Sequence, residues 1–456
     1  MALCFPPMFR NSPAMPYAIH TARVCGRPAR GNAMTRDVQK ISHHPSRVDP
    51  MVIAVNALGI TQITTWGTSY YCLGVLAKPI VAETGWPMTT VFLGFSVALL
   101  IMGFISTSVG GLIDRIGARA VMAVGTIIVS AGLLALSQIN DPTSYLAAWA
   151  VIGVGMRCCL YDAAFAALVQ VTPTRGRKAI SYLTLYGAYA STVFWVIGHY
   201  LNEAFGWRGT LVIFAAINLV VCLPLNWIGL ARRDPPERTA VAAVAPAASP
   251  DGPQLEGRKR LVGIVLFALI MSLNGFVFGV ISLQLVPLLE AAGLAGAMAV
   301  WVASLKGHGQ FTGRIVEIFF GRNLKAMTIA RIAIAVVPAS LVVLFFARGE
   351  VWHLAAFTLL LGASQGVITI VRGAVPLVLF GAQGYGTVLG LIATPILLVN
   401  AFSPALFALL VDQFGWRISV YALFGCSVIT WIAIELMSRW YEGVQARARS
   451  RLTTEA

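Results

Sequence analysis

Three ionisable residues, Arg157, Lys306 and His308, stand in the middle of long apolar stretches of the chain. Burying a charge at membrane depth is costly, so such residues are candidates for a functional site. A guanidinium can hold a carboxylate through two parallel hydrogen bonds, and an ammonium adds a point charge. An imidazole titrates near neutral pH and can carry a proton. Because few acidic residues occur at the same depth, this set predicts an anionic ligand and a coupled proton.

Each of these residues also has a purely structural interpretation. Lys306 can extend toward the membrane surface, or pair with Asp162 or Glu290. His308 can hydrogen-bond a neighbouring helix. Lys306 and His308 are two positions apart, so on a helix they point about 200° apart and cannot both face one cavity squarely.

Four aromatic residues in the same apolar stretches can stack on a ligand or hydrogen-bond to it: Trp66, Tyr70, Tyr71 and Tyr161. The alternative is that they pack against neighbouring helices or lie in the aromatic belt at the membrane surface. For Tyr71 we favour this second interpretation.

The elements that must position these residues are membrane-spanning helices. Of the 456 residues, 58% are hydrophobic and only 11% are charged, and the mean hydropathy is +0.78. In lipid every backbone polar group must be satisfied within the chain, and the apolar runs are too long and unbroken for a barrel. The sequence therefore predicts an all-α membrane protein. The net charge of +15 falls at the ends of the apolar runs, which argues against nucleic-acid binding.

Twelve apolar runs are long enough to cross a membrane. They lie near residues 53–78, 88–109, 119–138, 144–170, 179–202, 209–230, 261–288, 296–318, 327–347, 352–375, 386–410 and 416–438. The predicted organisation is a disordered tail at 1–50, a six-helix bundle at 51–230, a linker at 231–260, a second six-helix bundle at 261–438 and a tail at 439–456.

Lysine and arginine are distributed unevenly over the connecting segments. With the N-terminus inside, the inner segments hold 27 of the 33 basic residues and the outer loops hold four, while Arg157 and Lys306 remain within spans. Basic residues are enriched in cytoplasmic loops. The distribution predicts that both termini are cytoplasmic and that the number of spans is even.

The two predicted bundles repeat one another. The sequence FGWR at 205–208 recurs at 414–417, an offset of 209 residues. The turn after the second span has Gly110, Asp114 and Gly117, and the turn after the eighth has glycine, glutamate and glycine at an offset near 203. Two matches in the same order predict parallel halves related by an axis along the membrane normal.

The sequence GGLIDRIGAR at 110–119 resembles the loop motif G-x-L-x-D-R-x-G-x-R of major facilitator transporters, and it lies between spans two and three as in that family. The resemblance covers about residues 51–440 and implies twelve helices in two pseudo-symmetric bundles. The stretch 161–168 and the TGW turn at 84–86 are similar to a bacterial branch related to monocarboxylate and oxalate/formate porters. The proline-glycine motif of drug/proton antiporters is absent from span five.

In this family the loop motif belongs to a latch that holds the cytoplasmic side shut. The resemblance implies that Asp114 faces the N-terminal end of span eleven, where partial positive charge gathers, and that Arg115 and Arg119 pair with Asp162. The second half is expected to place Glu317 opposite Arg372. The alternative is that these residues only anchor loops at the headgroups. The predicted latch residues are Gly110, Asp114, Arg115, Gly117, Arg119, Asp162, Glu317 and Arg372.

The family's cavity is lined by spans one, four, seven and ten, with help from spans two, five, eight and eleven. This arrangement adds Asn274 and Gln365 as polar candidates. The predicted substrate and coupling residues are Arg157, Lys306, His308, Tyr70, Trp66, Tyr161, Asn274 and Gln365.

The predicted function is secondary transport by alternating access, in which a small organic anion such as a carboxylate moves with protons. The protein is expected in a bacterial inner membrane, as a monomer without cofactor, metal site or enzymatic activity. One alternative is efflux of a toxic drug or of a soft metalloid, with the thiols of Cys158 and Cys159 as ligands. A more remote alternative is a membrane sensor that transports nothing.

Overall fold

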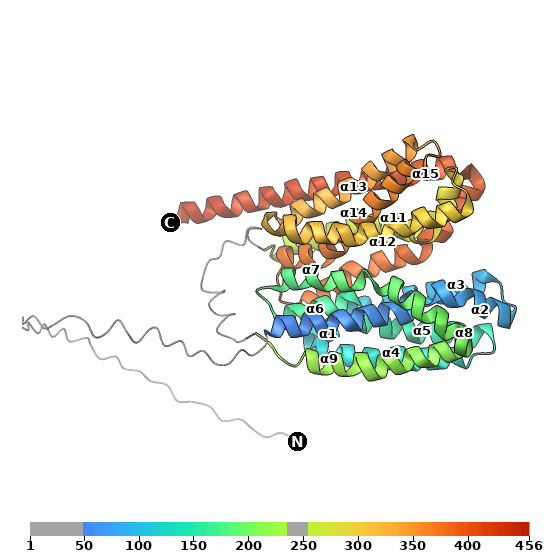
Figure 1. Ribbon diagram of the computed structural model, residues 1–456. Coiled ribbons are helices and arrows are strands. Elements are labelled where there is room, and N and C mark those ends of the chain that lie inside the picture. The colour runs from blue at the N-terminus through green and yellow to red at the C-terminus, as the bar shows by residue number, and fades with distance from the viewer. Residues whose placement is uncertain (1–48, 235–253, 456) are drawn as a thin grey trace, which may run out of the picture. The chain divides into compact units, whose positions relative to one another are not determined.

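The computed structural model describes residues 49–234 and 254–455. The tail predicted to be disordered and most of the predicted linker lie outside the described residues. Within the described ranges the chain is helical and contains no strand (Figure 1). The prediction of an all-α protein is confirmed.

The first half of the described chain, 49–234, forms eleven helical elements. They are α1 (Pro50–Thr65), the π-helix η1 (Trp66–Tyr70), α2 (Leu73–Thr84), α3 (Met88–Ile116), α4 (Ala118–Ser137), α5 (Pro142–Cys159), α6 (Tyr161–Val171), α7 (Gly176–Gly187), α8 (Ala190–Ile217), the π-helix η2 (Asn218–Cys222) and α9 (Leu223–Gly229).

The second half, 254–455, contains six helical elements. They are α11 (Gly257–Ala291), α12 (Gly296–Phe320), the short 3-10 helix η3 (Gly321–Asn323), α13 (Ala326–Phe346), α14 (Val351–Phe380) and α15 (Tyr385–Glu455). Helix α15 continues through most of the segment predicted as a C-terminal tail.

Eight helical stretches in the described chain are long and apolar enough to cross a membrane. Two of them, 176–229 and 385–447, bend sharply at Gly206 and Gly415, and each therefore supplies two spans. The α1–η1–α2 stretch and α12 fit the two remaining places of a twelve-helix fold. Helix α12 is less apolar because it carries Lys306 and other polar residues.

The two bends lie at the same position in the two copies of the FGWR sequence. Gly206 has φ 68° and ψ 173°, and Gly415 has φ 76° and ψ 166°. Positive φ is accessible to glycine at little cost, so glycine occupies the bend in both copies of FGWR. The similar backbone angles of Gly206 and Gly415, which lie 209 residues apart, support the predicted repeat of the two halves.

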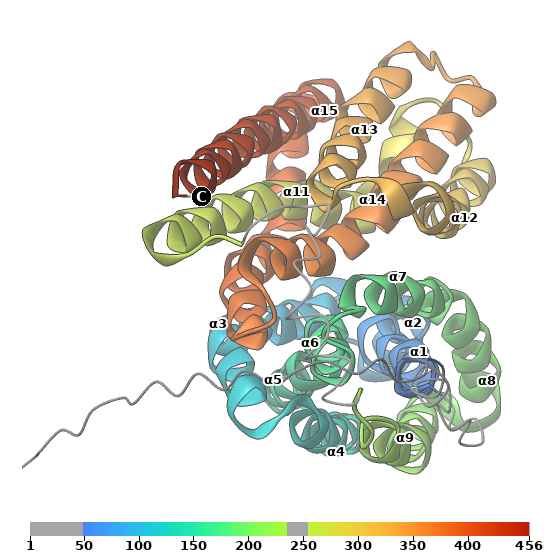
Figure 2. The ribbon, with the colours of Figure 1, turned by 90° about the vertical axis from the view of Figure 1, so that its left-hand side faces the viewer.

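The two halves form separate groups of helices that meet along α3 and the first part of α15 (Figure 2). Further contacts join α7 to α12 and α14, near the end of the bundle where α15 finishes, at the left of Figure 1. We call this the tail end. A buried apolar cluster near the tail end draws residues from both halves, including Phe165 and Leu168 from the first and Ile370 and Ala374 from the second.

Candidate substrate site

A cavity lies between the two halves and is lined by both. It contains about 1150 Å³ of empty space, part of which is continuous with open solvent. Its walls include residues of η1, α3, α5, α6 and α7 from the first half and of α11, α12, α14 and α15 from the second. A site of this size fits a small organic molecule.

Two irregular backbone segments shape the first-half wall. The π-helix η1 contains Trp66 and Tyr70, and the extended residue Leu160 (φ −81°, ψ −168°) separates α5 from α6. Irregular backbone at membrane depth is tolerated where it borders a cavity, and π-helical turns recur at functional sites. Both segments therefore place side chains in the cavity that a regular helix would direct elsewhere.

An ion network forms the tail side of the cavity. Arg157 Nη1 lies 3.0 Å from Asp162 Oδ2, and Arg372 Nη2 lies 2.7 Å from the same oxygen. The exposed fractions of the Arg157 and Asp162 side chains are only 2% and 7%. Because Arg372 belongs to the second half, Asp162 joins the halves through its carboxylate.

Arg314 is a cavity residue that sequence reasoning missed. The predicted span 296–318 contains Arg314, but the count of basic residues assigns its charge to the inner side; in the structure α12 places it in the cavity wall. Its side chain is 4% exposed and donates hydrogen bonds to the carbonyl oxygens of Thr184, at 2.6 Å, and Gly366, at 3.3 Å. Removing Arg314 and Arg372 from the inner set leaves 25 basic residues against four, so the orientation argument stands.

The charges that line the cavity do not cancel. Arg157, Arg314 and Arg372 are opposed by Asp162 alone, which leaves a formal charge of +2. In the described chain no carboxylate lies within ion-pair distance of Arg314. A buried positive charge without an acidic partner, such as that of Arg314, is costly at membrane depth and usually marks a functional site.

The predicted aromatic and amide residues line the same cavity. The ring centroid of Trp66 lies 4.7 Å from that of Tyr70, 6.0 Å from that of Tyr71 and 5.1 Å from that of Tyr161. Tyr71, for which packing is the favoured interpretation, packs against Trp66 and Tyr70 and also lines the cavity. Asn274 and Gln365 line it from the second half.

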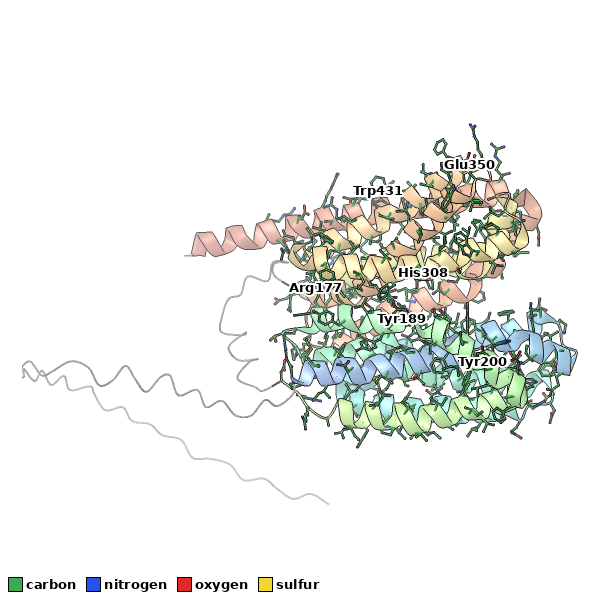
Figure 3. All side chains as sticks on the ribbon, in the orientation of Figure 1. Arg177, Tyr189, Tyr200, His308, Glu350 and Trp431 are labelled. Carbon is green, nitrogen blue, oxygen red and sulfur yellow. The ribbon has the colours of Figure 1, made fainter. Side chains whose placement is uncertain are left out.

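Lys306 and His308 are not among the residues that line this cavity. Lys306 is half-buried and its Nζ lies 5.3 Å from the ring centroid of Phe278, a lining residue. His308 is exposed, and Figure 3 shows it near the boundary between the halves. The two side chains differ in environment, as their spacing on a helix predicts.

The loop motif joins the two halves at the tail end. Asp114 accepts hydrogen bonds from the backbone N–H groups of Gly386, at 2.9 Å, and Thr387, at 2.7 Å, and from the Thr387 hydroxyl at 2.6 Å. These groups belong to the first turn of α15, so the carboxylate caps the positive end of that helix. The predicted contact of Asp114 with span eleven is present.

The predicted partners of Asp162 are wrong. Arg119 donates instead to the carbonyl oxygen of Trp227, at 2.7 Å, and stacks over its indole. Asp162 is taken by Arg157 and Arg372. The predicted partner of Arg115 is therefore occupied by other residues.

Glu317 does not face Arg372 as predicted, because Arg372 binds Asp162. Glu317 lies beside Ser181 and Arg177 of α7. Helix α7 begins span five, the counterpart of span eleven in the first half, so Glu317 repeats the relation of Asp114 to α15. Arg177 also donates to the carbonyl oxygens of Gly321 and Leu324 at the tail end (Figure 3).

Replacing Asp114 by alanine is expected to speed hydrogen exchange of the Gly386 and Thr387 amides by roughly tenfold or more, because hydrogen bonds to a charged acceptor are among the stronger ones. Asp114→Asn keeps one acceptor oxygen and should give a smaller increase. Mass spectrometry of peptides covering 384–390 measures both. Unchanged exchange in Asp114→Ala would show that the cap does not hold α15.

Cys158 and Cys159 are buried, and neither lines the cavity. Within the described ranges no group of three or more histidine, cysteine, aspartate or glutamate side chains is placed to hold a metal ion. The described residues therefore provide no set of metal ligands in the cavity that would support efflux of a metalloid.

Two helical halves that line a common cavity with buried charges and contact each other at one end define a class of membrane carriers. The chain belongs to the Major Facilitator Superfamily, whose family model matches residues 60–357.

The chain is similar to proteins of this family from distant sources. It is 25% identical to the "Uncharacterized MFS-type transporter YcxA" of Bacillus subtilis over 336 residues, which cover 72% of this chain and 76% of the relative. It is 28% identical to the "Multidrug resistance protein MdtL" of Shewanella oneidensis over 36% of this chain and 41% of the relative. The solved structure of the human organic anion transporter MFSD10 has a TM-score of 0.66 at 15% identity, covering 85% of this chain and all of that one.

Proposed function

We propose that this major facilitator transporter carries a small organic anion, such as a carboxylate, together with protons. The observation that supports the proposal is the formal charge of +2 on the cavity wall, with Arg314 free of any carboxylate partner in the described chain. An anionic substrate would supply the missing negative charge, and a guanidinium offers it paired hydrogen bonds.

The ion network suggests how binding could be coupled to movement of the halves. Asp162 Oδ2 bridges Arg157 of the first half and Arg372 of the second. A substrate carboxylate that takes over Arg372, or a proton that neutralises Asp162, would remove this tie between the halves. Either event would favour opening at the tail end, which is the step that alternating access requires.

We further propose that the tail end lies in the cytoplasm, because basic residues are enriched in cytoplasmic segments, and that the membrane is a bacterial inner membrane. In this orientation the contacts of Asp114 would act as a latch on the cytoplasmic side. The state described would then receive substrate from the outer side.

Purified protein in proteoliposomes is expected to take up labelled small carboxylates, and faster when a proton gradient is imposed. Arg314→Gln should lower this uptake by roughly tenfold or more, because a charge-assisted contact with the substrate is lost. Arg417→Gln, which changes an exposed arginine of α15 outside the cavity, serves as the matched control.

Arg314→Lys keeps the charge and should retain part of the uptake if the charge is what matters. Folding of each variant is checked by its thermal unfolding. If folded wild-type protein carries no carboxylate but does carry neutral or cationic compounds, the anion proposal fails.

A further inference from the structure

The two walls of the cavity differ in chemistry. The first-half wall presents five aromatic rings: Trp66, Tyr70, Tyr71, Tyr161 and Phe165. The second-half wall presents all of the amides and two guanidinium groups, from Asn274, Gln310, Arg314, Gln365, Arg372 and Asn400, together with the ring of Phe278, while Arg157 and Asp162 lie on the first-half wall. A ligand that fills the cavity therefore meets most of the rings on one side and all of the amides on the other.

The rings form one continuous cluster. Trp66 contacts Tyr70, Tyr71 and Tyr161, with centroid separations between 4.7 and 6.0 Å, and Tyr161 stacks on Phe165 at 5.2 Å and 16°. Gly187, opposite Tyr161, leaves room for its hydroxyl, because a Cβ at that position would overlap the Tyr161 oxygen. The wall is thus packed around the rings, which gives a flat partner a defined place to stack.

A cluster of aromatic rings can bind either a cation or an apolar ring. The charges decide between these classes, since the cavity already carries a formal charge of +2 and its one carboxylate is held by Arg157 and Arg372. A cationic ligand would be repelled. The remaining class is an anion whose body is a ring.

Two buried polar atoms of the second-half wall have no hydrogen-bond partner: Gln365 Nε2 and Asn400 Oδ1. One is a donor and the other an acceptor. Buried polar atoms are usually satisfied, so an unpaired donor and acceptor in a ligand cavity indicate groups that the ligand pairs with. A hydroxyl group can serve either atom, because it both donates and accepts.

From these observations we propose that the substrate is an aromatic carboxylate bearing a hydroxyl group, with its ring stacked on the first-half wall at Trp66 and its carboxylate at Arg314 and Arg372. This inference rests on the proposed transport of anions and specifies its substrate class. The second-half amides pair with the hydroxyl group.

The test compares uptake of three labelled acids into proteoliposomes: 4-hydroxybenzoate, benzoate and cyclohexanecarboxylate, the last a saturated acid of similar size. We expect KM to rise in that order. Trp66→Leu should raise the KM for the two aromatic acids about three- to tenfold, the range of an aromatic pair contact, and should raise that for cyclohexanecarboxylate less, because a saturated ring loses only apolar contact. Trp66→Phe keeps a ring and should retain most of the preference.

The matched control is Trp431→Leu, which changes an exposed tryptophan of α15 outside the cavity (Figure 3). Equal KM values for benzoate and cyclohexanecarboxylate in the wild type would overturn the aromatic assignment while leaving the anion proposal intact. Equal KM values for benzoate and 4-hydroxybenzoate would overturn the hydroxyl assignment. Absence of uptake for every carboxylate would overturn the proposed function itself.

Discussion

Replacing Asp162 by alanine is expected to destabilise the protein by roughly 3–5 kcal/mol and to abolish transport, because it leaves buried guanidinium groups without their counter-charge. Arg157 is 2% exposed and its one ion-pair partner in the described chain is Asp162. Arg372 loses the same carboxylate oxygen. Thermal unfolding in detergent measures the loss of stability, and proteoliposome uptake measures the loss of function.

Two further variants distinguish loss of the Arg157–Asp162 ion pair from a general loss of folding. The double variant Arg157→Gln with Asp162→Ala also removes the fully buried guanidinium of Arg157 and leaves only the partly exposed Arg372 without its partner, so it should recover much of the lost stability without recovering transport. Asp412→Ala changes an exposed aspartate of α15 and should leave both unchanged. Wild-type stability in Asp162→Ala would show that the ion network of Arg157, Asp162 and Arg372 does not hold the two halves together.

The Arg157–Asp162 pair also shows why sequence reasoning found both residues but not their contact. Five positions on a regular helix correspond to about 500°, so residues 157 and 162 would point about 140° apart. The extended backbone of Leu160 interrupts the helix and brings the two side chains together. No composition or periodicity signal marks this break, because Leu160 is an ordinary helix-forming residue.

The fold is easier to predict from the sequence than the site, because the fold depends on the average composition of long segments. Long apolar runs require helices in lipid, and the repeated FGWR sequence places its glycines at two equivalent bends. Arg314 lies within the predicted span 296–318, but its place near the inner end of that span favours an interpretation as one of the basic residues of the inner side. Its burial in the cavity wall depends on the packing of α12 against α7 and α14, which no local pattern in the sequence reports.

Of the contacts made by the loop motif, too, only some can be predicted from the sequence. Asp114 was placed correctly because a carboxylate near a helix N-terminus is a local electrostatic preference. The partner of Arg119 was not, since the Trp227 carbonyl becomes available only through the packing of α9 against α4. Gln170 of α6 also binds the motif turn, donating to the Ile113 carbonyl and accepting from the Ala118 amide, and nothing in the sequence singled it out.

Gly110→Ala is expected to favour opening of the tail end and to lower uptake by roughly tenfold or more, as overpacking by one methyl group costs about 1–3 kcal/mol. A Cβ at Gly110 would overlap the carbonyl oxygen of Gly386, which is backbone of the other half and cannot rotate away. Gly111→Ala is the matched control, because its Cβ would lie 3.8 Å from the Thr387 hydroxyl oxygen.

Both substitutions raise helix propensity equally, since each replaces glycine by alanine in α3. A difference between them therefore reports the contact between α3 and α15 and not the stability of α3 itself. Hydrogen exchange of peptides covering 384–390 should rise in Gly110→Ala and remain at the wild-type level in Gly111→Ala. Equal exchange and equal uptake in the two variants would mean that the halves do not need this close approach, and that closure of the tail end depends on Asp114 and the ion network instead.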